Sequence, residues 1–241
     1  MTFDQFVYPS NEAPLLDAYN HRFESVYILL HPFIRVPEEM AWKVTRQYPT
    51  DDQILALPAK CNWSQIVAPT GISNCAKLNQ ALLTATGSLV DYLCDYPARN
   101  ALQQFLQAEP IWMPGQGAFE PLLHDDFLAA FKEADHDELI FVPEFPQADS
   151  VERFPLADLS ARAVPFPGRG SLVAPDASFL FTVDWDSFFT LFYGPRAFIR
   201  NLARARRLEG FFGAPTTEHS WFNYTMGCAT VTVSPEDWYQ S

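Results

Sequence analysis

Proline is spread along most of the chain, and this limits the length of the regular elements that the protein can contain. The 241 residues include 20 prolines but only 10 glycines. Because proline fixes φ and lacks a backbone donor, it ends or bends most helices and strands that contain it. We therefore expect short helices and strands joined by rigid turns, which argues against a long-helix bundle or a simple repeat.

Hydrophobic patterns predict both helices and strands along the chain. Apolar runs predict strands at 26–30, 139–142, 179–184, 188–193 and 229–233. Helical spacing, proline starts and helix-ending residues predict helices at 37–48, 77–96, 98–108, from Pro121 to Phe131, and at 195–207. The expected fold class is α+β, in which a mixed or antiparallel sheet packs against several short helices with Pro-rich connections.

The length of the chain suits one large domain, and we expect residues 1–241 to form a single α+β domain. Residues 149–175 are rich in proline, glycine and polar side chains, which is typical of a long surface connection. The alternative is that this segment separates two subdomains.

The formal net charge of −13 restricts the partners that the protein can have. Such a charge repels nucleic acid and anionic membranes and attracts cationic partners, although it can also serve solubility alone. The N-terminus lacks the features of a signal peptide, and no apolar run is long enough to cross a bilayer. The four cysteines are widely spaced, so buried reduced thiols and a cytoplasmic location are expected.

Sequence motifs for known chemistry are missing. The chain contains no phosphate-binding loop, dinucleotide fingerprint or recognised nucleophile motif, so no cofactor and no catalytic residue is predicted. His124, Asp125 and Asp126 include a His-Asp pair, but further ligands at matched positions are missing, and the acids suit a helix N-terminus. The arginines at 196, 200, 204, 206 and 207 could hold an anion, or could complement a helix C-terminus and pair with nearby acids.

The segment 179–193 is the most distinctive part of the sequence. Two apolar runs flank Asp184, Trp185, Asp186 and Ser187, a pattern that predicts a hairpin with an acidic turn. Carboxylates at i and i+2 could share a divalent cation, but a turn with two solvated or capping acids explains them as well. No metal site is therefore predicted.

Two segments combine acidic and aromatic residues in a way that suits contact with a cationic surface. An exposed aromatic side chain supplies contact area and neighbouring acids select positive charge, although tryptophans are more often buried. The candidate partner-binding residues are Asp184, Trp185, Asp186, Glu218, His219 and Trp221.

Several strings resemble an uncharacterised bacterial family of unknown function. They are WSQIV at 63–67, LNQALLTATGSL at 78–89, IWMP at 111–114, DWDSFFT at 184–190 and LEGFF at 208–212. The resemblance spans residues 60–225 and supplies no catalytic residue. It implies a small cytosolic protein of the kind encoded beside bacterial polymorphic toxins.

Two functional hypotheses follow. The first is an immunity protein, not an enzyme, that neutralises a cognate and basic toxin domain by stoichiometric binding to its active-site region. The second is a metal-dependent enzyme that acts on a nucleotide-sugar or phosphoester with Asp184, Asp186 and one of the histidines.

Overall fold

The computed structural model describes residues 3–11, 13–36, 49–56, 60–147 and 150–222. The predicted helix at 37–48 and the predicted strand at 229–233 lie outside these residues. The strands are β1 (Ser25–Leu30), β2 (Phe33–Arg35), β3 (Lys60–Cys61), β4 (Ile111–Trp112), β5 (Glu138–Pro143), β6 (Glu152–Pro155), β7 (Gly170–Val173), β8 (Leu180–Thr182), β9 (Phe189–Gly194) and β10 (Gly210–Phe212).

The helices are also short. The α-helices are α1 (Asp51–Leu55), α2 (Trp63–Thr70), α3 (Cys75–Thr86), α4 (Tyr96–Ala108), α5 (His124–Glu133), α6 (Leu156–Ser160) and α7 (Arg196–Arg206). The 3-10 segments are η1 (Leu15–His21), which is interrupted by a kink at residues 18–20, η3 (Asp91–Leu93) and η4 (Pro121–Leu123). The predicted α+β class is confirmed.

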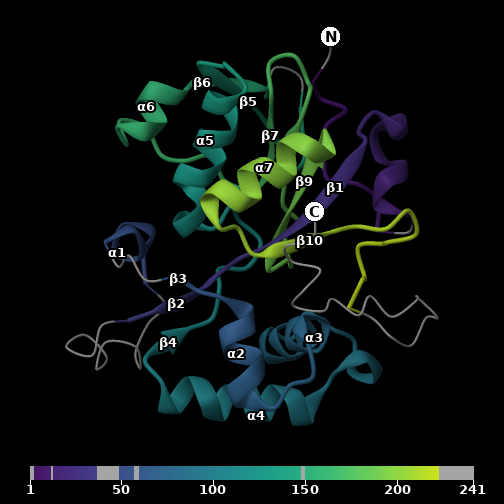
Figure 1. Ribbon diagram of the computed structural model, residues 1–241, viewed down its shortest axis with the longest axis vertical. Coiled ribbons are helices and arrows are strands. Elements are labelled where there is room, and N and C mark those ends of the chain that lie inside the picture. The colour runs from purple at the N-terminus through teal and green to yellow at the C-terminus, as the bar shows by residue number, and fades with distance from the viewer. Residues whose placement is uncertain (1–2, 12, 37–48, 57–59, 148–149, 223–241) are drawn as a thin grey trace.

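Two antiparallel sheets organise the chain. The larger has seven strands in the order β10-β1-β9-β8-β7-β5-β6, and the smaller has three in the order β3-β2-β4. All described strand pairs are antiparallel. Near one edge of the large sheet, β1 lies between β9 and the edge strand β10, so a strand from the start of the chain pairs with two from its last third (Figure 1).

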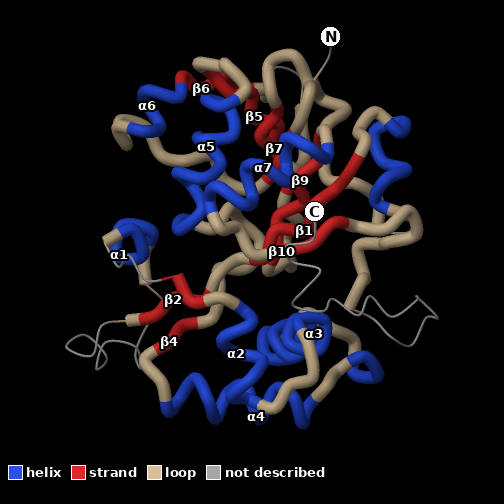
Figure 2. Tube along the Cα trace, viewed as in Figure 1, coloured by secondary structure: helices blue, strands red, loops and turns tan. Residues whose placement is uncertain are grey.

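Both faces of the large sheet are covered, because successive side chains of a strand point to opposite faces. Val26, Ile28 and Leu30 of β1 belong to one apolar cluster, which also contains side chains of α2, α3 and α4. Tyr27 and Leu29 belong to a second cluster, formed with α5, α6 and α7. Figure 2 shows α2, α3 and α4 together at one end of the molecule and α5, α6 and α7 beside the strands at the other.

The sequence predicted one continuous helix over residues 77–96. This prediction is wrong, because the helix is interrupted. Helix α3 ends at Thr86, because Gly87 adopts the left-handed conformation (φ +73°) and closes the last turn with its N–H. No atom lies within 4 Å of a Cβ built on Gly87, so this glycine serves the helix end and not a close approach. Helix α4 then begins at Tyr96, where the Asp95 side chain accepts from Ala98 N.

The segment 149–175 is not a simple connection. It contains β6, α6 and β7, and β6 and β7 both pair with β5 in the large sheet. Its proline and glycine residues suggested a loop, but they occupy positions that strands tolerate. Pro155 lies at the end of the edge strand β6. Gly170 begins β7 at a point where Val142 O comes close to its backbone. The large sheet therefore continues through this segment.

Glu209 joins the large sheet to the helical layer. Its buried carboxylate accepts hydrogen bonds from the N–H groups of Trp63 and Ser64, in the first turn of α2. Burial raises the pKa of Glu209, and these hydrogen bonds oppose that effect. A carboxylate at this position satisfies free N–H groups and interacts favourably with the helix dipole.

Candidate metal centre

The turn between β8 and β9 is held in place by a neighbouring loop. Ser187 N donates to Asp184 O at 3.2 Å, which closes the turn. From the loop after β4, the Gln116 amide donates to Asp186 O at 3.0 Å and Gly117 N donates to Ser187 O at 3.0 Å. Gly117 is required here, because φ is +71° and a Cβ would lie 2.0 Å from the carbonyl oxygen of Trp185.

His219 reaches the same place from the segment after β10. Glu218 forms a bridge with Pro14, and Leu15 N donates to Thr217 O at 2.8 Å, so this segment is attached to the N-terminal arm. The His219 ring packs on Phe189 with 5.7 Å between ring centroids. Its Nδ1 lies 2.7 Å from the hydroxyl of Tyr8, which fixes the orientation of the imidazole.

Asp184, Asp186 and His219 form a cluster of potential metal ligands. One ligand atom from each lies within 4.8 Å of the others. The Asp184 Oδ2 atom lies 3.6 Å from His219 Nε2, beyond hydrogen-bonding distance, and this buried oxygen has no hydrogen-bond partner among the described residues. A buried polar atom without a partner is costly, so the cluster is suited to a cation that would satisfy it.

The 3.6 Å between Asp184 Oδ2 and His219 Nε2 is within the range for two ligands of one ion, and the other separations are at most 4.8 Å. Bonds of about 2.1 Å place ligand atoms on opposite sides of an ion about 4.2 Å apart. Ligand atoms that are not opposite one another lie closer than this, so an ion can fit the cluster with at most small movements of the side chains. Two carboxylates and one imidazole form a mixed oxygen and nitrogen donor set, which suits Mn²⁺, Fe²⁺ or Zn²⁺.

Burial and charge shift the protonation of the cluster. Burial and the neighbouring Asp184 raise the pKa of Asp186 to about 6. Burial lowers the pKa of His219, and Asp184 partly opposes this change. Burial and Asp184 also raise the pKa of Tyr8. Two carboxyl groups thus meet beside an imidazole whose lowered pKa favours the neutral form, which is the form of histidine that binds metals.

Comparison with known proteins assigns the chain to a family. The family model described as Protein of unknown function (DUF2711) matches residues 11–223. This protein is a member of the DUF2711 family. The uncharacterized protein YwbB of Bacillus subtilis (strain 168) is similar, with 21% identity over 226 residues that cover 90% of this chain and 98% of YwbB. No solved structure matches the chain.

The resemblance to an uncharacterised bacterial family, seen in the sequence, is thereby confirmed. The link to toxin neutralisation stays a prediction. Within the described residues of this DUF2711 protein, no helix has the length and apolar character needed to span a bilayer.

The six residues that the sequence proposed for partner binding have different environments in the DUF2711 structure. Trp185 is 55% exposed, and Asp186 and Glu218 are partly buried. Asp184, His219 and Trp221 are buried, and the Trp221 ring packs on Phe189 and Phe211. The structure therefore brings Asp184, Asp186 and His219 together inside the protein and leaves Trp185 as the exposed side chain of the turn.

Tyr8 is a member of this site that sequence reasoning missed. It lies in an N-terminal arm without a motif, and no local pattern connects it with a histidine 211 positions later. The one general indication is that the hydroxyl of a buried tyrosine usually needs a hydrogen-bond partner.

Four of the other candidate residues have structural roles, namely His124, Asp126, Arg196 and Arg206. The His124 ring stacks on Phe166 with centroids 3.7 Å apart. Asp126 forms ion pairs with Lys60 at 2.5 Å and with Arg206 at 2.8 Å. The side chain of Arg196 lies over the ring of Phe212 at 4.0 Å. Local packing and pairing thus account for these residues without a ligand.

Proposed function

We propose that this protein is a metal-dependent enzyme whose divalent ion is held by Asp184, Asp186 and His219. The observation that carries the proposal is the buried Asp184 Oδ2 atom, which lacks a hydrogen-bond partner beside a second carboxylate and an imidazole. The second hypothesis from the sequence also combined Asp184 and Asp186 with a histidine, but it did not specify which histidine. The Tyr8 hydroxyl supports His219 from outside, as outer hydrogen-bond partners commonly do for metal-bound histidines.

Three protein ligands leave coordination positions open on an ion. An open position allows the metal to activate a bound water or to polarise an oxygen of a phosphoester or nucleotide-sugar. The residues of this chain have defined parts in such a site. Asp184 and Asp186 supply negative charge, while His219 supplies a neutral nitrogen that Tyr8 holds in position.

A direct test is calorimetric titration of the purified protein with Mn²⁺ and Zn²⁺. Binding at micromolar concentration is expected, and Asp184→Asn and His219→Ala should each weaken it strongly. His21→Ala is a matched control, because His21 also lies beside an aspartate, Asp17, at 3.5 Å, but on the exposed surface. An affinity that is unchanged in Asp184→Asn, or no binding at all, would contradict the site.

The enzymatic part of the proposal requires a separate measurement. Hydrolysis of bis(p-nitrophenyl) phosphate and of UDP-glucose should be measured with Mn²⁺ and with EDTA. Activity that needs Mn²⁺ and is lost in Asp184→Asn supports an enzyme. Tight binding of the metal without turnover of either substrate class would leave a structural metal site and contradict the enzymatic role.

A second candidate function is the immunity-type binding protein, which neutralises a cognate, basic toxin domain. It is favoured by the exposed Trp185 beside Asp186 and by the net charge of −13. Co-expression with the toxin gene next to its own gene tests this function. Protection of the host cell that is lost in Trp185→Ala supports the immunity function. Phe145→Ala, which removes another exposed aromatic side chain, is the control and should keep protection. Absence of protection by the natural protein argues against this function.

A further inference from the structure

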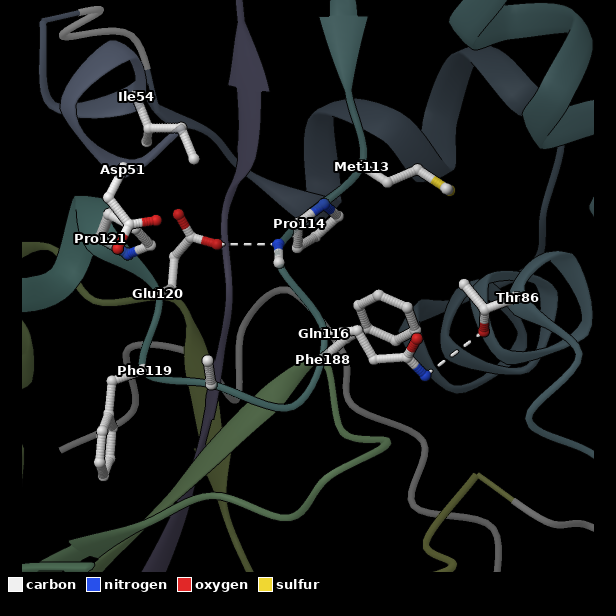
Figure 3. A pocket seen from close by; sticks show the side chains of 12 residues that line it. Asp51, Ile54, Thr86, Met113, Pro114, Gln116, Phe119, Glu120, Pro121 and Phe188 are labelled. Atoms are coloured by element: carbon white, nitrogen blue, oxygen red, sulfur yellow. Dashed lines mark hydrogen bonds between the residues drawn. The ribbon is translucent and has the colours of Figure 1, made fainter. Parts of the chain in front are cut away.

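A second feature of the molecule is a cavity of about 380 Å³ on the other side of the loop that holds the acidic turn. It lies between α1, the loop from β4 to η4, and Phe188 at the end of the turn (Figure 3). Cavities of this size hold small organic molecules in many proteins.

The walls of the cavity are mainly apolar and its polar groups lie at two ends. Phe119, Phe188, Ile54, Met113, Pro114 and Pro121 contribute apolar surface. In Figure 3 the carboxylates of Asp51 and Glu120 point toward one another at one end, while Gln116 and Thr86, joined by a hydrogen bond of 3.4 Å, lie at the other. Among the described residues, those that line the cavity include no lysine, arginine or histidine.

Glu120 is the buried member of the carboxylate pair. Its side chain accepts hydrogen bonds from Gly115 N at 2.9 Å and from Leu122 N at 3.4 Å, which fixes its position. Burial raises its pKa to about 7, and the charge of Asp51 acts in the same direction. Lys60 opposes these effects only from a distance, because its amino group is paired with Asp126 at 2.5 Å.

We propose that this cavity binds a small organic ammonium compound, with the cationic nitrogen between Asp51 and Glu120 and the apolar part against Phe119 and Phe188. An ammonium group forms strong, charge-assisted hydrogen bonds with carboxylates, and aromatic rings also attract cations. Two carboxylates in a cavity whose described lining has no cationic side chain favour a positive ligand over a neutral or negative one. This site is separate from the metal centre and does not depend on it.

Binding of a cation is also expected to release protons. Free Glu120 is partly protonated near neutral pH, and an ammonium group stabilises its charged form. Calorimetry at pH 7 in buffers with different ionisation enthalpies should therefore detect release of a fraction of a proton per ligand bound.

Benzylamine is a suitable probe, since it combines an ammonium group with an aromatic ring. Benzyl alcohol and benzoate have the same ring with a neutral or a negative group. We expect benzylamine to bind the full chain about tenfold or more tightly than benzyl alcohol, because the charge-assisted contacts are lost in the alcohol. Benzoate should bind more weakly than either.

Two variants of α1 separate the cavity from the general acidity of the protein. Asp51→Asn should weaken benzylamine binding about tenfold, whereas Asp52→Asn, in the same helical turn but not lining this cavity, should change it less than about twofold. Asp184→Asn should leave benzylamine binding intact, so that failure of the metal proposal does not affect this test. Equal binding of benzylamine and benzyl alcohol, equal effects of the two α1 variants, or no binding at millimolar concentration would overturn the proposal.

Discussion

The hydroxyl of Tyr8 lies 2.7 Å from Nδ1 of His219, so the N-terminal arm orients a side chain near the far end of the described chain. The two rings also meet edge to face, with centroids 5.5 Å apart. A hydrogen bond to the second nitrogen of a histidine commonly fixes its tautomer and orientation at a metal. The arm is thus part of the proposed centre.

Tyr8→Phe should reduce the affinity for Mn²⁺ by about 10- to 100-fold, because His219 loses the partner that orients it. The hydrogen bond also contributes to folding, and its loss should lower the free energy of unfolding by about 1 kcal/mol. Titration calorimetry and chemical denaturation measure these effects.

Tyr19→Phe is the control for this variant. The Tyr19 hydroxyl donates to Val7 O at 2.8 Å in the same arm, and the described ring contacts of Tyr19 are with Phe6, Phe23 and Tyr193 and not with His219. It should cost similar stability and leave the Mn²⁺ affinity unchanged. Equal losses of metal affinity in both variants would show that the arm acts only through general stability.

Asp184→Asn should stabilise the metal-free protein while it abolishes the response to metal. The substitution removes the buried one of two neighbouring carboxylates, and thereby the repulsion between Asp184 and Asp186. An increase of about 1 kcal/mol in the free energy of unfolding is expected in EDTA. Thermal unfolding with EDTA and with Mn²⁺ measures both effects, and a large fall in melting temperature in EDTA would contradict the assignment.

Gly117→Ala should lower the free energy of unfolding by more than the backbone strain of a single alanine explains, because it also disturbs the acidic turn. At Gly71 the φ angle is also +71°, but no atom lies within 4 Å of an added Cβ, whereas at Gly117 the Trp185 carbonyl lies 2.0 Å away. Gly71→Ala should therefore cost about 1 kcal/mol from backbone strain alone. Gly117→Ala should lower the free energy of unfolding clearly more than this, because its Cβ would also clash with the Trp185 carbonyl.

Only the Gly117 variant should also weaken Mn²⁺ binding, since it displaces the turn that carries Asp184 and Asp186. Denaturation and metal titration of the two alanine variants, side by side, provide the measurement. Metal affinity that is unchanged in Gly117→Ala would show that the turn can move without loss of the site.

Glu120 should make stability depend on pH in an unusual direction for an acidic residue. Its pKa is about 7 in the folded protein against an ordinary value of 4.5, so between these values the folded state keeps a proton that the unfolded chain releases. The contribution of Glu120 is therefore complete below pH 4.5, falls as the pH rises, and is lost above pH 7. The difference across this interval is about 3 kcal/mol.

Glu120→Gln should flatten this dependence, because glutamine has no proton to release. Chemical denaturation between pH 4.5 and pH 8 gives the difference between the natural protein and the variant at each pH. The exposed Glu133→Gln is the control and should keep the pH dependence of the natural protein. A difference between natural protein and Glu120→Gln that does not change with pH would contradict the prediction.

Much of the fold could be predicted from local sequence patterns. The runs at 26–30 and 179–193 predicted β1 and the β8–β9 hairpin, because their apolar residues and turn have no other good arrangement. The helix end at Gly87 and the strands within 149–175 were missed. A glycine can serve either packing or a left-handed helix end, and strands of only four residues, such as β6 and β7, contain too few apolar residues to be recognised.

The site was only partly predictable, for a different reason. Asp184 and Asp186 are two residues apart, so their proximity follows from the turn. Their meeting with His219 depends on the pairing of β1 with both β9 and β10, which no local pattern encodes. Glu120 was not noticed at all, because its importance comes from burial and from the loop that surrounds it.

The place of β1 in the large sheet has a consequence for the synthesis of the protein. This apolar strand leaves the ribosome early, but its two neighbours, β9 and β10, are among the last described elements to appear. At usual rates of translation, β1 waits on the order of ten seconds with both edges unpaired. We therefore expect the nascent chain to be prone to aggregation until its last third has emerged, and to be assisted by chaperones that act during translation.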